Sequence, residues 1–160
     1  MYRNILVPID RSDAAQRGLD EAIALAKMLR GRILLVNVVN ELDGVPADLP
    51  GVDFRSIVED LSRDGKAILA HARERASAQG VEADTRLVEV WGGRAGDEVI
   101  GLAKDWPAEL IVCGTHGRRG IRRMLLGSDA EYIVRHSPVP VLLVRAGKND
   151  EITEAGASLG

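Results

Sequence analysis

Residues 110–128 read LIVCGTHGRRGIRRMLLGS, a stretch that joins a strand, a loop and the start of a helix. The first four residues are a short continuous apolar run, which is typical of a strand buried on both faces. The glycine-punctuated segment that follows, 114–127, is predicted to be a loop. Ser128 is expected to open the next helix as its N-cap, because Glu131 stands three residues later and completes a capping box. A buried strand, a loop and a capped helix in this order are a building unit of parallel α/β sheets.

The rest of the chain repeats this alternation. Apolar runs predict further strands at 5–9, 33–39, 85–90 and 141–144. The run at 85–90 is more polar and is expected at an edge of the sheet. Apolar residues at spacings of three and four predict helices between the strands, the first ended by Gly31 and the second by Gly80. Five strands that alternate with four helices predict an α/β fold, a doubly wound, five-stranded parallel sheet with helices on both faces.

Length and composition are those of an ordinary globular domain, with 160 residues of which 46% are hydrophobic. We expect one domain over 1–146 and a disordered tail over 147–160, because the tail carries no apolar period. The net charge of −3 argues against nucleic acid as a partner, and no apolar run is long enough for membrane insertion. Cys113 is the only cysteine, so no intrachain disulfide is possible. Together with an N-terminus unlike a signal peptide, this predicts a cytoplasmic protein.

Parallel sheets of this type bind ligands outside the carboxyl ends of their strands, where the strand order reverses. Asp10 follows the first predicted strand, and the glycine-rich loop follows the fourth. Glycines allow the close backbone approach and the positive φ that a phosphate cradle requires, and a helix that starts at Ser128 would present free amides to an anion. Arginines at 118, 119, 122 and 123 could hold phosphate oxygens.

The pattern Gly114-x2-Gly117-x9-Gly127-Ser128 resembles the ATP-binding signature of the universal stress protein family. Other stretches also resemble the family's strands, and the resemblance covers residues 1–146. These stretches are NILVPID at 4–10, LLVNVV at 34–39, AELIVCGTHG at 108–117 and SPVPVLLVR at 137–145. The resemblance implies a Rossmann-like fold of the adenine-nucleotide-binding type. It also implies a homodimer joined through the fifth strand, Val141 to Val144.

The same resemblance implies a cytosolic regulatory protein of the stress response that binds ATP and is not an enzyme. Asp10 would accept from a ribose hydroxyl or help to hold Mg²⁺, and Val38 would close over the base. Gly117, Gly127 and Ser128 would hold the phosphates, while Cys113 and Gly114 would contribute main-chain groups. The full set of implied nucleotide-binding residues is Pro8, Ile9, Asp10, Val38, Cys113, Gly114, Gly117, Arg118, Gly127, Ser128 and Asp129.

Asp129 departs from the family pattern, in which the residue after the signature serine is usually small and apolar. Its carboxylate could point into solvent, pair with the loop arginines or recruit Mg²⁺, with Asp10 as the other candidate ligand; the protein alone offers no metal site. An acidic residue in a first helical turn is also a plain stabilising feature.

Other interpretations stay open at this stage. Asp10 could merely cap the turn after its strand, and Cys113 is more simply explained by packing than by redox chemistry. A slow ATPase or another nucleotide-handling enzyme on the same scaffold would need a base, for which His116 and Asp129 are the candidates. A third possibility is an adaptor dimer that binds no nucleotide and whose glycine loop is structural.

Overall fold

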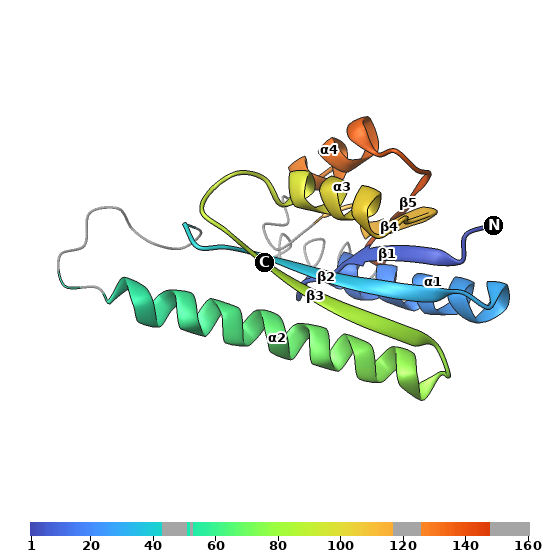
Figure 1. Cartoon of the computed structure of the whole chain (residues 1–160), viewed down its shortest axis with the longest axis horizontal. Helices are drawn as coiled ribbons and strands as arrows, with labels where there is room; N and C mark the ends of the chain where they lie inside the picture. Colours follow the sequence, from blue (N-terminus) through green and yellow to red (C-terminus); the bar gives the residue numbers. More distant parts are fainter. Residues whose placement is uncertain (43–50, 52, 117–125, 148–160) are drawn as a thin grey trace, which may run out of the picture.

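Five parallel strands form one sheet in the order β3-β2-β1-β4-β5 (Figure 1). The computed structural model describes residues 1–42, 51, 53–116 and 126–147. The strands are β1 (Asn4–Pro8), β2 (Arg32–Asn40), β3 (Glu82–Val90), β4 (Leu110–Gly114) and β5 (Val141–Val144). The helices between them are α1 (Asp13–Leu29), α2 (Phe54–Ala78), α3 (Ala95–Asp105) and α4 (Ser128–His136). This architecture confirms the predicted doubly wound fold.

The continuous apolar runs form strands because both of their faces are covered. Ile5, Leu6 and Val7 in β1 are all fully buried. Side chains alternate along a strand, so Ile5 and Val7 lie in a core cluster with residues of α1 and α2. Leu6 lies in a second cluster with residues of α3 and α4. One helix pair therefore covers each face of the sheet.

β3 lies at an edge of the sheet, as its more polar sequence predicts, and β5 forms the other edge. β3 begins at Glu82, three residues before the expected start, and pairs with β2 in the register Arg32↔Glu82. The short turn before it has Gly80 at φ 75°, as a helix-terminating glycine requires. The turn after it has both Gly92 and Gly93 at positive φ.

The end of α1 differs from the prediction that Gly31 terminates the helix. Arg30 takes the left-handed conformation, with φ 53° and ψ 43°, and its amide donates to the carbonyl of Ala26. Gly31 is needed for a different reason: a Cβ there would lie 2.6 Å from the carbonyl oxygen of Arg3. Glycine is therefore required at position 31 by close packing against the residue before β1, and the sequence of α1 alone does not show this contact.

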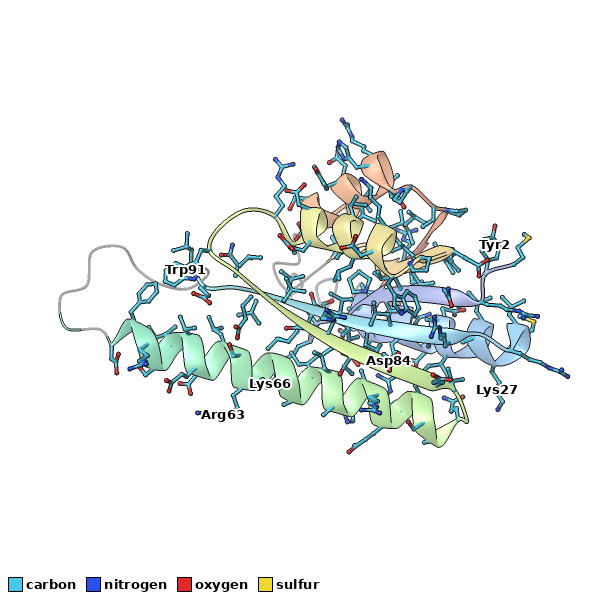
Figure 2. All side chains as sticks on the ribbon, in the orientation of Figure 1. Tyr2, Lys27, Arg63, Lys66, Asp84 and Trp91 are labelled. Atoms are coloured by element: carbon cyan, nitrogen blue, oxygen red, sulfur yellow. The ribbon has the colours of Figure 1, made fainter. Side chains whose placement is uncertain are left out.

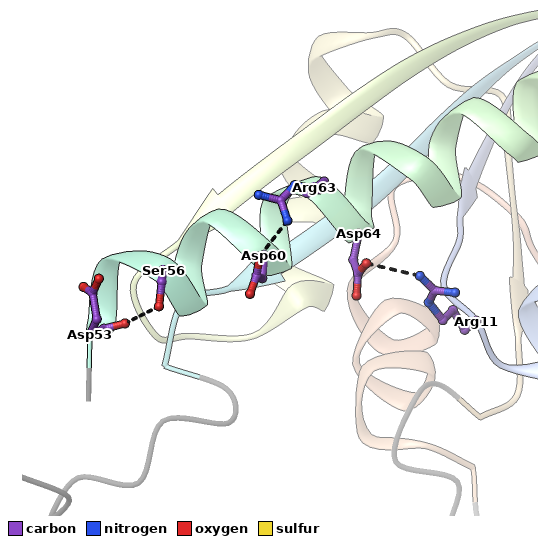
Figure 3. A network of polar contacts seen from close by, with 6 residues as sticks. All are labelled: Arg11, Asp53, Ser56, Asp60, Arg63 and Asp64. Atoms are coloured by element: carbon purple, nitrogen blue, oxygen red, sulfur yellow. Dashed lines mark hydrogen bonds and ion pairs between the residues drawn. The ribbon is translucent and has the colours of Figure 1, made fainter. Parts of the chain in front are cut away.

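Polar side chains on the exposed face of α2 form hydrogen bonds and ion pairs, one of which connects α2 to the β1–α1 loop (Figure 3). The carboxylate of Asp53 accepts from the amide of Arg55 and caps the helix. Arg11 pairs with Asp64 at 3.4 Å, with both side chains more than half exposed. Exposed pairs of this kind contribute little stability, about 0–1 kcal/mol. Within the described chain, no helix combines the length and the apolar character that a membrane crossing would require.

Candidate functional site

The strand order reverses between β1 and β4, which is where parallel sheets of this type form their ligand-binding crevice. From β1 the chain proceeds to β2 on one side, and it later enters β4 on the other side of β1. The two strands are parallel, so their carboxyl ends lie at the same edge of the sheet. Asp10 follows β1 and Gly114 ends β4. The fold thus brings together the two segments that the sequence singled out.

The backbone at the end of β1 is fixed by its neighbours. The Ile9 amide donates to the Val36 carbonyl at 2.8 Å, and the Asn37 side-chain amide donates to the Ile9 carbonyl at 2.8 Å. From α1, Nε2 of Gln16 donates to the Asp10 carbonyl at 2.6 Å. Sequence reasoning missed Asn37 and Gln16. The signal for Asn37 was a single polar residue inside an apolar strand, and the side chain is indeed buried.

Ser12 joins the loops after β1 and β4. Its hydroxyl oxygen accepts from the Ala15 amide at 3.2 Å as the N-cap of α1, and its hydroxyl donates to the His116 carbonyl at 3.2 Å. The Asp10 carboxylate accepts from the Ser12 amide at 2.8 Å. The alternative role of Asp10 as a turn-capping residue is therefore present in the structure, although the helix cap itself is Ser12. The effect is to hold Asp10 close to the β4–α4 connection.

Gly114 sits where β4 meets the first turn of α1. A Cβ at this position would lie 2.7 Å from backbone atoms of Ala14 and Ala15, far inside van der Waals contact. Gly18, one turn further along α1, faces Gly114 with ordinary room, its own Cβ position being 3.6 Å from the Gly114 nitrogen. The glycine of the signature that ends β4 thus has a packing role of its own, apart from any ligand.

The start of α4 corrects the capping prediction. Gly127, not Ser128, is the N-cap, and no side chain caps this helix. The predicted capping box is therefore wrong. The Glu131 amide donates to the Gly127 carbonyl, and the Glu131 carboxylate pairs with Arg135 at 2.9 Å. The reason is the entry of the chain into the helix, since the Gly127 amide is bound to the Thr115 carbonyl at 2.8 Å. Gly127 has φ −59° and ψ 150°, so the expected positive φ is also wrong at this position.

The side chain of Asp129 contacts another helix. Its Oδ1 accepts from the amide of Gly96 at 3.2 Å, in the first turn of α3. The N-cap of α3, Arg94, makes no side-chain capping bond of its own, so Asp129 supplies the acceptor from α4. This contact resembles the stabilising role considered for Asp129, although it acts on a helix other than its own.

Of the remaining predicted site residues, Cys113 is buried, Pro8 and Val38 are half-buried, and two lie outside the described residues. Cys113 is 4% exposed, and burial raises the pKa of its thiol to about 12. It therefore stays protonated and packs as an apolar residue. Val38 is half-buried against the core cluster below α3 and α4. Gly117 and Arg118 lie outside the described residues, as do the other loop arginines.

The described residues contain no group of three or more His, Cys, Asp or Glu side chains placed to hold a metal ion. A cavity of about 370 Å³ borders the β1–α1 loop on the α1–α2 side and is lined by Arg11, Gln16, Ala67, Ile68 and His71. Near the crevice, Nδ1 of His116 lies 3.1 Å from the Thr115 hydroxyl. The chemical groups available at the ends of β1 and β4 are backbone amides and the Asp10 carboxylate, which can bind a ligand by hydrogen bonds.

This chain is similar to known proteins both in sequence and in fold. The chain matches the universal stress protein family over residues 1–145. It is 32% identical over 151 residues to the universal stress protein YxiE of Bacillus subtilis, which covers 91% of this chain and 100% of that protein. A universal stress protein family structure from Burkholderia pseudomallei is 34% identical with a TM-score of 0.72, covering 89% of this chain and 96% of that one.

A second solved structure, a universal stress protein in complex with cAMP, is 26% identical with a TM-score of 0.65. The match covers 91% of this chain and 98% of that chain. The family match, the sequence identity and the fold thus agree in one conclusion: this chain belongs to the universal stress protein family.

Proposed function

We propose that this chain is a regulatory protein of the stress response that binds ATP at the carboxyl ends of β1 and β4. One observation carries the proposal. α4 begins beside this crevice with a glycine N-cap and no capping side chain, so its first-turn amides have no side-chain acceptor in the described structure. An anion at that place gains both the amides and the positive end of the helix dipole. The cAMP complex of a related protein supports the choice of an adenine nucleotide.

The proposed roles follow the position of each residue. The Asp10 carboxylate receives the ribose hydroxyls, and Val38 lies against the base. Gly127 and Ser128 give their amides to the phosphates, and Ser128 is exposed and can add its hydroxyl. The other proposed contacts are from Pro8, Ile9, Cys113 and Gly114 through the main chain, and from Gly117 and Arg118 in the undescribed loop.

Mg²⁺ would arrive with the phosphates of ATP, and its candidate protein ligands are Asp10 and Asp129. Each of these carboxylates also accepts from a backbone amide, Asp10 from Ser12 at 2.8 Å and Asp129 from Gly96 at 3.2 Å. We propose a binding role without catalysis in the cytoplasm. A slow ATPase and an adaptor that binds no nucleotide are outcomes that the test below distinguishes.

We further propose a homodimer through β5. This strand is the last of the sheet, and its outer edge has no partner strand within the described chain. Val141 and Leu143 are half-buried and Leu142 is 37% exposed, so apolar side chains continue to the edge. Unpaired strand edges favour association with a second copy. Light scattering at tens of micromolar protein checks this, and a mass of one chain would contradict it.

The decisive experiment is calorimetric titration of the whole chain with ATP, AMP and cAMP, with and without Mg²⁺. Two variants at one position separate charge from shape. Gly127→Asp supplies the missing helix cap and also places a negative charge beside the phosphates, whereas Gly127→Asn supplies a similar cap without charge. A carboxylate about 5 Å from a phosphate weakens binding about fivefold even in water-like surroundings. We therefore expect Gly127→Asp to bind ATP at least fivefold more weakly than Gly127→Asn.

Ser128→Ala serves as a second probe. Because Ser128 is not the N-cap, its removal should leave the melting temperature unchanged and weaken ATP about fivefold through one lost hydrogen bond. If the wild-type chain binds no nucleotide at millimolar concentration, the adaptor interpretation replaces the proposal. Release of phosphate from bound ATP in a single turnover would make the chain an enzyme.

A further inference from the structure

A second cluster of basic residues lies at the opposite end of the sheet, where the strands begin. It borders a cavity of about 230 Å³ lined by Arg3, Asn4, Arg30, Gly31, Arg32 and Glu82. We call it the arginine pocket. It lies at the end of the molecule where the N-terminus emerges and α1 turns into β2 (Figure 1), on the same side as Tyr2 and Lys27 in Figure 2. The crevice between β1 and β4 is at the other ends of these strands.

The arginines of the pocket form no ion pair among the described residues. Three arginines and one glutamate are among the residues that line the cavity, although the whole chain has a net charge of −3. Among the described residues, none of the three guanidinium groups lies within 4.0 Å of a carboxylate oxygen. Even Glu82, the direct cross-strand neighbour of Arg32, does not pair with it. The residues that line this cavity therefore carry more positive than negative charge.

Arg32 is held in a fixed orientation by neutral partners. Its Nε donates to the side-chain oxygen of Asn4 at 3.0 Å, and its guanidinium carbon lies 5.2 Å from the ring centre of Trp106. The Asn4 side chain is itself fixed, because its Nδ2 donates to the Pro107 carbonyl at 3.1 Å. The Trp106 ring attracts the positive charge through a cation–π contact, but neither partner is an anion, and the terminal nitrogens of Arg32 keep their donors. A preorganised guanidinium of this kind is suited to bind phosphate oxygens.

The backbone also brings the arginines together. The absence of a side chain at Gly31 lets the α1–β2 turn approach the carbonyl of Arg3, and the Arg32 amide bonds that carbonyl at 2.7 Å. Glu109 holds the other side by accepting from the Arg3 and Asn4 amides, and these bonds lower the pKa of its carboxyl. The charge of Arg3 also lowers the pKa of the Glu109 carboxyl, although the hydrogen bonds of Glu109 are to backbone amides and not to a guanidinium group.

Arg30 has a left-handed backbone conformation, which favours glycine over arginine. Its φ of 53° lies in the left-handed region, which costs a non-glycine residue about 1 kcal/mol and which glycine adopts freely. Arginine at this point adds strain without adding an ion pair. Such a sacrifice of stability is expected where a side chain serves a ligand.

We propose that the arginine pocket binds a small anion that carries phosphoryl groups, of the class of inorganic pyrophosphate and phosphate monoesters. At roughly 30 Å³ for each water molecule, the cavity has the volume of about eight waters, which is enough for one or two phosphoryl groups. Binding weakens as the ionic strength rises, because the arginines are exposed. This site is separate from the proposed nucleotide site, and neither proposal depends on the other.

The test is an amide NMR titration of the whole chain with sodium pyrophosphate at low salt, followed by calorimetry. We expect the amides of Gly31 and Arg32 to shift with one saturable curve, independently of the Gly127 amide. Parallel titrations with inorganic phosphate and with glycerol phosphate show which kind of phosphoryl compound the pocket prefers. Tight binding of the monoester indicates a phosphorylated metabolite, and binding of pyrophosphate alone indicates the free polyanion.

Two variants of Arg30 separate ligand binding from folding. Arg30→Gln removes the charge but keeps the left-handed strain, so it should weaken pyrophosphate binding about fivefold with no gain in stability. Arg30→Gly should weaken binding to the same extent while raising the melting temperature by about 2–4 °C. A purely structural arginine would not give this opposite response of affinity and stability.

Lys66→Gln is the matched control. Lys66 is exposed on α2, away from this end of the sheet (Figure 2), and its loss changes the net charge by the same amount. It should leave the affinity for pyrophosphate unchanged. The proposal is overturned if Lys66→Gln weakens binding as much as Arg30→Gln does. It is equally overturned if pyrophosphate shifts only the amides around Gly127, or none at all.

Discussion

Replacing Gly114 by alanine tests how the candidate site is built. The new Cβ would lie 2.7 Å from backbone atoms of Ala14 and Ala15 and 2.9 Å from the Ala14 Cβ. Backbone atoms cannot rotate away, so the first turn of α1 must move by about 1 Å to restore normal contact. Gly114 does not have a positive φ, so the effect is one of packing and not of backbone strain.

The expected cost of this overpacking is about 1–3 kcal/mol of unfolding free energy. A domain of this size loses about 2–4 °C of melting temperature for each kcal/mol, which gives a decrease of about 2–12 °C. The same movement displaces Ser12, whose hydroxyl joins α1 to the His116 carbonyl. We therefore expect Gly114→Ala also to weaken nucleotide binding, although no side chain that would touch the nucleotide has been removed.

Two matched glycines make the comparison quantitative. Gly101 in α3 has nothing within 4 Å of its Cβ position, and Gly18 in α1 has only ordinary contacts. Alanine should stabilise the chain at Gly101, by about 1 kcal/mol from helix propensity, and should do no harm at Gly18. Chemical and thermal unfolding of the three variants measures the difference. The reasoning is refuted if Gly114→Ala is as stable as Gly101→Ala.

Three further predictions concern buried or bridging groups. Asp129→Ala removes the acceptor of the Gly96 amide and should lower the unfolding free energy by about 0.5–1.5 kcal/mol in urea titrations, whereas full stability would show that the contact contributes nothing. The Cys113 thiol should resist iodoacetamide at pH 8 until the chain unfolds. Since its folded-state pKa is raised from 9.0 to about 12, stability that is present below pH 9 should fall as pH rises toward 12, and less steeply in Cys113→Ala. Glu41 is 6% exposed and its Oε2 has no hydrogen-bond partner in the described structure, so Glu41→Leu should stabilise the chain by about 1–3 kcal/mol; a lower melting temperature would contradict this.

The placement of Asp10 and Gly114 at one edge of the sheet was predictable because it depends on strand order. Once the apolar runs at 5–9 and 110–113 are read as parallel strands, their carboxyl ends must share an edge, and Asp10 and Gly114 follow. The hydrogen bonds that hold the site were not predictable. The side chains of Asn37, Gln16 and Ser12 donate hydrogen bonds to backbone carbonyl groups that the fold brings near. Every residue has a backbone carbonyl, so the sequence does not show which one will be the acceptor.

Local sequence patterns determined the elements of this protein, since burial on both faces requires continuous apolar runs and helices require apolar stripes. The tertiary structure decided how the elements end and meet. Gly127 is the N-cap of α4 in place of Ser128, with its amide bound to the Thr115 carbonyl, and Arg30, not Gly31, is the left-handed residue at the end of α1. Such choices depend on distances between segments far apart in the chain. No spacing of residue types within one segment can encode those distances, so only the folded chain fixes them.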